Sequence, residues 1–356
     1  HAVCAIAPGE WVHSHNLKTN LAGTLSYEYR PNWTAQKASC GRTFRGYRRA
    51  DGRVGIRNEV WIIPTVGCVN AIARQIETAA QSLRTGSIDG IYAYTHPYGC
   101  SQLGDDQLRT QKALSGLIRH PNAGAVLVLG LGCENNGIDA LRAVLGPVDP
   151  ERVQFLNCAD EPDEVAAALA LLRPLCARAA EAIRTECPVS DLVLGLKCGG
   201  SDGFSGITAN PLLGRFSDML TACGGTTVLS EVPEMFGAET ILMNRAENES
   251  VFEDIVSMIN NFKLYFTRYG QNIYENPSPG NKKGGITTLE DKSLGCTQKG
   301  GTGIVTDVLS YGEHAHKPGL NLLTGPGNDI VACTALAASG VHMILFTTGR
   351  GTPLGA

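Results

Sequence analysis

The chain has 356 residues, of which 43% are hydrophobic and 18% charged, with 42 glycines and a formal net charge of −4. This length predicts two or three domains with sizeable apolar cores. The negative net charge and the lack of a dense Lys/Arg cluster argue against nucleic acid as a partner, and no apolar run approaches the roughly 20 residues of a membrane-spanning helix.

Twelve cysteines occur in this long chain, whose start lacks the basic and then apolar stretch of a secretory signal. This usage predicts reduced thiols in a cytoplasmic protein rather than a disulfide framework. The first residues resemble the interior of a strand and the last residues end without a helix, so we expect sequence to be missing on both sides.

Residues 1–44 predict the end of a small β module followed by an irregular linker. Residues 11–15 alternate in polarity like a strand, which would place His13 and His15 on one face of it. Two imidazoles on one face could bind a metal or a substrate carboxylate. Exposed histidines on an edge strand are the alternative.

Beyond the linker, short apolar runs alternate with helical patterns, which predicts an α/β fold with parallel sheets covered by helices on both faces. The predicted helices span 70–82, 105–118, 137–144, 162–184, 211–221 and 249–265, and three later strands are predicted at 191–197, 226–230 and 341–346. A proline-containing stretch at 187–190 predicts a domain boundary. Residues 277–301 are predicted to be irregular.

Five cysteines stand beside glycine, and the first four of them directly follow an apolar run: Cys68, Cys100, Cys133, Cys198 and Cys296. Ligands of parallel sheets bind beyond the carboxyl ends of the strands, so we expect these thiols to gather at one edge. Cys68, Cys100 and Cys133, with Glu134 beside the last of them, would suit iron or zinc. Small buried thiols followed by helix-capping amides are the alternative.

A glycine-rich loop at 198–206 follows a predicted strand. Gly199, Gly200, Ser201 and Asp202 could offer backbone N–H groups and polar side chains to an anion. The loop matches neither glycine pattern for nucleotide phosphates, and the chain lacks the G-x-S-x-G of a hydrolase elbow. A carboxylate or hydroxyl-rich ligand therefore suits it better.

Further titratable residues lie at predicted strand ends. His96 precedes Cys100 and could be a base, a metal ligand or an ordinary strand-end residue. Glu231 and Glu234 follow the strand at 226–230, where their carboxylates could be hard metal ligands.

The polar, turn-rich stretch from residue 277 onward is typical of a functional loop inside a compact domain. Within it, Lys292 and Glu290 are candidate acid–base or substrate-clamping groups, and an ion pair at a solvated helix start is the alternative. Arg350 ends the last strand and is suited to bidentate binding of a carboxylate.

Several long motifs carry a family resemblance, at residues 46–58, 98–106, 130–136, 198–206, 276–282 and 347–353. They resemble the altronate/galactarate dehydratase family over essentially the whole chain. Residues 207–218 and 231–239 are most similar to its altronate-type members.

The resemblance implies a small N-terminal β-clip domain, of which residues 1–44 would retain only the end and a linker. It also implies a middle α/β domain at 45–188, where a homodimer interface could form, and a C-terminal Rossmann-like domain at 189–356. Iron-dependent activity under reducing conditions is a further implication of the resemblance.

The implied reaction is dehydration of D-altronate to 2-dehydro-3-deoxy-D-gluconate by loss of the C2 proton and the C3 hydroxyl. We assign iron, as Fe²⁺ or in an iron–sulfur cluster, to Cys68, Cys100, Cys133 and nearby Glu134, and rank Cys296 below them. Lys292 or His96 is the expected base, whereas Asn281, Arg350 and the backbone at 199–201 would bind the carboxylate. Elimination from galactarate or a sulfonated hydroxy acid, and an inactive sugar-acid-binding subunit, remain alternatives.

Overall fold

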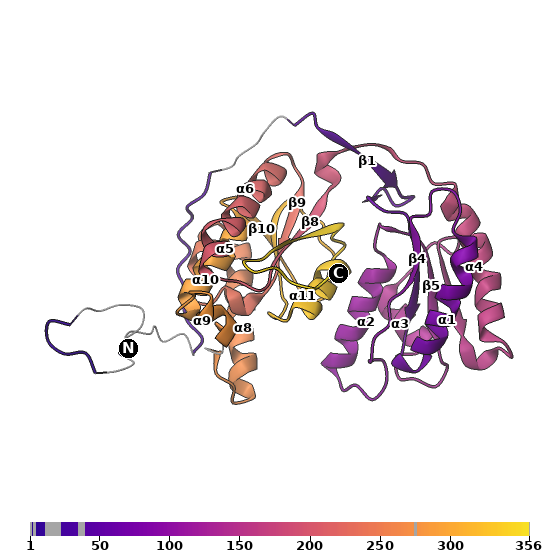
Figure 1. Ribbon diagram of the computed structural model, residues 1–356, viewed down its shortest axis with the longest axis horizontal. Coiled ribbons are helices and arrows are strands. Elements are labelled where there is room, and N and C mark those ends of the chain that lie inside the picture. The colour runs from indigo at the N-terminus through magenta and orange to yellow at the C-terminus, as the bar shows by residue number, and fades with distance from the viewer. Residues whose placement is uncertain (1, 3–4, 11–22, 35–39, 274–275, 356) are drawn as a thin grey trace.

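The computed structural model describes residues 2, 5–10, 23–34, 40–273 and 276–355. Two lobes stand side by side in Figure 1: an indigo-to-magenta lobe with elements from residues 43–188 and a pink-to-yellow lobe with elements from residues 193–347. Each lobe contains one parallel sheet with helices packed against it.

The first lobe holds a four-stranded parallel sheet in the order β4-β3-β5-β6. Its strands are β3 (Glu59–Pro64), β4 (Gly90–Ala93), β5 (Ala123–Gly130) and β6 (Val153–Asn157), and its helices are α1 (Asn70–Ala80), α2 (Asp105–Ile118), α3 (Ile138–Leu145) and α4 (Glu164–Ala180). Strand β3 is buried throughout because alternate side chains enter two separate apolar clusters. Val60 and Ile62 pack with α1 and α4, whereas Trp61 and Ile63 pack with α2 and α3.

The second lobe holds a five-stranded parallel sheet in the order β10-β11-β9-β8-β12. Its strands are β8 (Val193–Cys198), β9 (Thr226–Leu229), β10 (Val305–Leu309), β11 (Gly319–Leu323) and β12 (Met343–Thr347). Its helices are α5 (Gly203–Ile207), α6 (Ala209–Ala222), α7 (Glu239–Met243), α8 (Glu249–Arg268), α9 (Pro279–Lys283), α10 (Leu289–Thr297) and α11 (Asp329–Ala338). The chain runs from β8 to β9 on one side and returns to β12 on the other, so the strand order reverses beside β8. Ligands of such sheets bind in the crevice at this reversal.

A small antiparallel sheet joins the ends of the first lobe. It contains β1 (Thr43–Arg48), β2 (Val54–Gly55) and β7 (Thr185–Pro188) in the order β2-β1-β7. Because β7 directly precedes β8, this sheet lies at the passage of the chain into the second lobe.

The lobes contact each other through α2 and α11. Gly116 of α2 lies so close to α11 that an added Cβ would be 2.1 Å from the carbonyl oxygen of Ala338. Beside this contact, His120 Nε2 bonds to the carbonyl oxygen of Val341 at 2.9 Å, and Asn122 donates to the carbonyl oxygen of His342 at 3.1 Å.

Residues 23–34 run along the second lobe rather than the first, as Figure 1 shows. The Tyr27 hydroxyl donates to Glu239 at 2.5 Å, and Tyr29 and Trp33 both donate to the carbonyl oxygen of Ala246 at 2.9 Å. Tyr29 also lies 5.2 Å from Phe252 between ring centroids. This linker segment is therefore anchored on α7 and α8.

The α/β prediction with covered parallel sheets is confirmed. The helices at 70–82, 105–118 and 249–265 correspond to α1, α2 and α8. The prediction that 277–301 is irregular was wrong, because α9 and α10 lie there. Both are short, and each begins where a hydroxyl accepts a backbone N–H, Ser278 from Asn281 and Thr288 from Asp291. The predicted β-clip strand lies outside the described residues.

No helix in the described part of the chain combines the length and apolarity needed to cross a membrane.

The lobe contact predicts a loss of stability in acid. Burial lowers the pKa of His120 to about 3, and burial also lowers the pKa values of His314 and His342 to about 4. The folded state therefore binds fewer protons than the unfolded state below pH 6.5. We expect the free energy of unfolding to fall as pH drops from about 6.5 to 4, by up to about 1.4 kcal/mol per pH unit for each histidine.

Urea unfolding across this pH range measures the effect, and His342→Asn is the matched variant. His342 Nδ1 accepts a hydrogen bond from the Val193 N–H at 3.1 Å, and an asparagine oxygen can replace that acceptor without titrating. The variant should flatten the pH dependence. An unchanged slope would contradict the assignment of this histidine.

Candidate active site

The candidate active site lies at the carboxyl end of β8, where the strand order reverses. Strand β8 ends with Lys197 and Cys198, and Glu231 and Glu234 follow β9. Helix α10 and the turn after it bring Lys292, Cys296 and Lys299, and α11 begins with Asp329. These side chains come from four separate segments of the chain and form one cluster.

Lysines and carboxylates alternate through this cluster. Lys197 contacts Glu231 and lies 2.7 Å from Asp329 Oδ1. Lys299 Nζ is 3.0 Å from Glu231 Oε2 and 3.9 Å from Glu234 Oε2.

Lys292 is the last member of this series of alternating charges, and its Nζ lies 2.8 Å from Glu234 Oε1. All five side chains from Lys197 to Lys292 are nearly inaccessible, whereas Asp329 is 37% exposed. Buried side chains remain ionised only where nearby opposite charges compensate the loss of hydration.

The network fixes the protonation of its members. Burial would lower the pKa of Lys292, but Glu234 raises it above its ordinary value. Burial would also lower the pKa of Lys299, but Cys198 and Glu231 raise it above its ordinary value. Burial would raise the pKa of Glu234, but Lys292 and Lys299 lower it to about 2. Both lysines are therefore cations at neutral pH and Glu234 is an anion.

Glu231 has a backbone conformation that is costly for a residue with a side chain. Its φ of 72° and ψ of 58° are left-handed, and only Ser101 shares a positive φ among the non-glycine residues that the structure describes. Such strain costs of order 1–3 kcal/mol and is concentrated at functional sites. Burial and the neighbouring Glu234 also raise the pKa of Glu231.

Cys198, Glu234 and Cys296 could hold a metal ion. Within the described residues they are the only His, Cys, Asp or Glu group of three or more whose ligand atoms all lie within 4.8 Å of one another. Cys198 Sγ is 3.6 Å from Cys296 Sγ and 3.2 Å from Glu234 Oε2. Two thiolates and one carboxylate are a donor set that suits iron or zinc, so these residues fit a thiophilic divalent metal.

The glycine-rich loop after Cys198 is open to an anion. In the described part of the chain, the N–H groups of Gly200 and Ser201 have no protein acceptor, whereas the N–H of Gly199 bonds to the carbonyl oxygen of Thr347 at 3.1 Å. An added Cβ at Gly200 would lie 3.1 Å from Thr348 Oγ1, a buried hydroxyl without a partner among the described residues. Binding of a carboxylate by this loop stays a prediction.

The other predicted substrate-binding residues near this loop make hydrogen bonds within the protein. Asp202 caps α5 by accepting the Ser205 N–H at 2.7 Å. Asn281 donates to the carbonyl oxygen of Ser201 at 2.9 Å, and its own oxygen lies 3.3 Å from Lys292 Nζ. Exposed Arg350 bonds to the carbonyl oxygen of Gly280. Asn281 thus connects the glycine-rich loop to Lys292.

The structure separates His96 from this cluster. His96 lies in the first lobe, where its Nε2–H donates to the Pro64 carbonyl oxygen at 2.8 Å and its Nδ1 accepts the Tyr98 N–H at 3.1 Å. Both ring nitrogens are therefore used, and burial lowers the pKa of His96. Glu290 lies in the first turn of α10, two residues before Lys292. His13 and His15 lie outside the described residues.

The expectation that all five glycine-flanked cysteines gather at one edge was wrong, because the five follow two different sheets. Cys198 and Cys296 lie together in the second lobe, and the other three lie at the carboxyl edge of the first sheet. Cys68, Cys100 and Cys133 follow β3, β4 and β5, and all three are exposed. They are not part of a compact metal-ligand group among the described residues. Glu134 accepts hydrogen bonds from Thr65 Oγ1 at 2.6 Å and from two backbone N–H groups. The assignment of iron to these residues stays a prediction.

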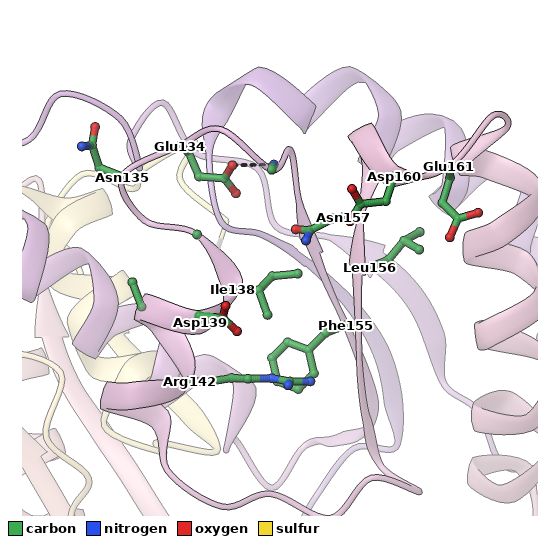
Figure 2. A pocket seen from close by; sticks show the side chains of 13 residues that line it. Glu134, Asn135, Ile138, Asp139, Arg142, Phe155, Leu156, Asn157, Asp160 and Glu161 are labelled. Atoms are coloured by element: carbon green, nitrogen blue, oxygen red, sulfur yellow. Dashed lines mark hydrogen bonds between the residues drawn. The ribbon is translucent and has the colours of Figure 1, made fainter.

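A cavity of about 550 Å³ opens beside the Cys133 loop, between α3 and β6. Figure 2 shows Glu134 and Asn135 at its edge, with Arg142 stacked on the ring of Phe155, 4.0 Å from guanidinium carbon to ring centroid. The charged cluster of the second lobe is instead tightly packed. A ligand would approach that cluster from the side of Asp329 and the glycine-rich loop.

Sequence reasoning missed Lys197, Lys299 and Asp329. A lysine within the apolar run of β8 was a signal, because a lysine in a fully buried strand requires a carboxylate partner. Lys299 and Asp329 stand in ordinary polar contexts, and only the fold brings them to Cys198 and Lys197.

Family models match most of the chain. The D-galactarate/altronate dehydratase C-terminal model matches residues 189–356, and the D-galactarate dehydratase/altronate hydrolase second-domain model matches residues 46–180. The whole chain is 56% identical to an altronate dehydratase of Escherichia coli K12 and 57% identical to that of Bacillus subtilis 168, spanning 72% of each. A galactarate dehydratase (L-threo-forming) of E. coli is 35% identical over 88% of the chain and 63% of its own length.

Proposed function

The chain belongs to the D-galactarate/altronate dehydratase family, and on that premise we propose that it dehydrates D-altronate to 2-dehydro-3-deoxy-D-gluconate. The observation that carries the proposal is the buried cluster of lysines, carboxylates and thiols beneath a loop with free backbone N–H groups. A binding subunit without activity would have no need for three lysine cations buried beneath its ligand site.

Removal of the C2 proton is the difficult step, because a hydrogen next to a carboxylate is very weakly acidic. Negative charge then develops on the carboxylate oxygens and must be stabilised. The N–H groups of Gly200 and Ser201 would hold the carboxylate, with Arg350 at the rim. Lys292 would supply a fixed positive charge, since its ammonium group is already oriented by Glu234 and Asn281.

Asp329 is the best-placed base. Its Oδ1 is held by Lys197 at 2.7 Å, and its Oδ2 would lie 2.7 Å from a Cβ added at Gly199. Asp329 is the most exposed carboxylate of this cluster, so a bound substrate would reach it before Glu231 or Glu234. We assign the C2 proton to Asp329 Oδ2. The raised pKa of Lys292 favours it as the donor to the departing C3 hydroxyl instead of the base.

We assign the family's metal to Cys198, Glu234 and Cys296, as Fe²⁺. When bound there, iron would supply Lewis-acid stabilisation of the developing negative charge. The hydrogen bond with Cys198, followed by burial, raises the pKa of Cys296 well above its ordinary value. Metal binding would therefore release the Cys296 proton. A homodimer and a cytoplasmic location complete the proposal, the latter supported by free thiols at all eleven described cysteines.

The test is release of 2-keto acid by anaerobically purified protein supplied with Fe²⁺ and thiol. We expect altronate to exceed galactarate and sulfolactate by at least about tenfold in kcat/KM. Asp329→Asn should lower kcat by about 10²–10⁴-fold, whereas Asp254→Asn, an exposed change on α8, should not. Faster turnover of another acid would refute the substrate, and an active Asp329→Asn would refute the base.

A further inference from the structure

Two partly exposed cysteines meet where the chain passes between the lobes. Cys40 lies in the segment just before β1, and Cys223 is the residue that ends α6. The Cys223 thiol donates a hydrogen bond to the sulfur of Cys40, so the two side chains are in contact. By contrast, Cys198 and Cys296 of the candidate active site are buried. The contact between Cys40 and Cys223 is therefore open to reagents in solution.

One turn of the chain holds both cysteine-bearing segments in place. This turn, η4 (Val189–Asp191), lies between β7 and β8. Its Val189 N–H donates to the carbonyl oxygen of Arg42, two residues after the first cysteine, at 3.1 Å. Directly after the second cysteine, an added Cβ at Gly224 would lie 3.3 Å from the Cβ of Ser190 in the same turn. The main chain thus brings the two cysteines together independently of their thiols.

The two thiols differ in how readily they ionise. The hydrogen bond from Cys223, followed by a backbone hydrogen bond from Arg42, lowers the pKa of Cys40 below its ordinary value. The hydrogen bond with Cys40, followed by burial, raises the pKa of Cys223. A thiol that ionises readily is the better candidate for attack on a disulfide, and a second thiol beside it can resolve the product. Cys40 therefore suits the attacking role and Cys223 the resolving role.

We propose that Cys40 and Cys223 form a reversible disulfide, with a small-molecule disulfide such as oxidised glutathione as the oxidant. The Cys40 thiolate attacks one sulfur of oxidised glutathione, which forms a mixed disulfide and releases one glutathione thiolate. The Cys223 thiol then loses its proton, and its sulfur attacks the Cys40 sulfur and releases the second glutathione. Two protein thiols are oxidised, and one glutathione disulfide is reduced to two thiols that take up the two protons.

The disulfide connects the two lobes a second time. The chain itself passes from β7 of the first lobe into β8 of the second, and the new bond joins the segment before β1 to the end of α6. Cys40 precedes β1 and Cys223 follows α6, so an adjustment that brings the sulfur atoms to about 2.0 Å leaves both elements in place. Two covalent connections side by side restrict rotation of one lobe against the other. The redox state of this pair thus sets how freely the lobes move.

The test incubates the whole chain with excess oxidised glutathione in the absence of oxygen, then blocks free thiols and digests the protein with trypsin. Cleavage after lysine and arginine releases Cys40 in the peptide 38–42 and Cys223 in the peptide 216–245, and neither contains another cysteine. Mass spectrometry should find these two peptides linked in wild type. The link should also form in Cys68→Ser, a control that removes an exposed thiol outside the pair. Excess reduced glutathione should free both peptides again.

Single changes separate the roles of the two thiols. Cys223→Ser should accumulate glutathione on Cys40, because no second thiol remains to displace it. In Cys40→Ser, glutathione should add to Cys223 at least about tenfold more slowly, since that thiol is less ionised. Absence of linked peptides in folded wild type, or a link that forms equally fast in urea-unfolded protein, would overturn the proposal. The readout involves no turnover, so its result is independent of the proposed function.

Discussion

Lys292→Met is expected to lower kcat for altronate by about 10²–10³-fold with a smaller change in KM. This magnitude is typical for removal of one preorganised group that stabilises transition-state charge. The ammonium of Lys292 lies 2.8 Å from Glu234 and 3.3 Å from the Asn281 oxygen, so it is oriented before substrate arrives. Steady-state kinetics with D-altronate separate the two parameters.

Two further variants make this result interpretable. Lys282→Met removes an exposed lysine at the end of α9 and should leave both parameters unchanged. The single change leaves the Glu234 carboxylate buried without its nearest cation, and the double variant Lys292→Met with Glu234→Gln removes that carboxylate charge as well. Thermal unfolding of both variants shows whether a loss of activity results from misfolding. A rise in KM at constant kcat would show that Lys292 only binds substrate.

Glu231→Ala is expected to lower the free energy of unfolding by about 3–5 kcal/mol. Glu231 contacts Lys197 and lies 3.0 Å from Lys299, and all three side chains are at most 1% exposed. Removal of the carboxylate leaves the ammonium groups of Lys197 and Lys299 buried with less negative charge beside them. Urea unfolding at neutral pH measures the change through the midpoint, with the slope as a check on two-state behaviour.

An exposed ion pair provides the control for this change. Arg30 and Glu28 are 2.6 Å apart, with side chains 74% and 73% exposed. Solvent screens the charges of such an exposed pair, so Glu28→Ala should change stability little. Equal effects of the two changes would contradict the structural importance of the buried network.

The sheets could be predicted from sequence because their strands are continuous apolar runs. In β5, seven of eight residues are buried, including residues on both faces of the sheet. A strand with one face exposed to solvent would instead alternate between buried and exposed residues. Helices α9 and α10 could not be predicted in the same way. They have five and nine residues, too few for a helical period, and their starts depend on single capping hydroxyls. The predicted division at 44 and 188 stays a prediction.

The candidate site was predicted only where chemistry is local in sequence. The loop at Gly199 and Gly200 and the residue Lys292 were identified because each stands in a distinctive stretch. The pairing of Cys198 with Lys299, 101 residues apart and 2.8 Å from Sγ to Nζ, has no local signal. Such contacts result from strand order, which the pattern of apolar runs does not specify.

Gly116 bears on how sequences of this kind can diverge. The main chains of α2 and α11 are in direct contact at Gly116. No side chain lies between the two helices there, so the angle between the lobes cannot be adjusted by exchanging one apolar side chain for another of different size. Gly312 is similar, with an added Cβ 2.8 Å from the Cβ of Lys112. Substitutions can therefore accumulate around either site and change ligand preference without reorienting one lobe against the other. A single methyl group at residue 116 would do the opposite, because it would push the two helices apart while leaving every ligand-binding residue intact.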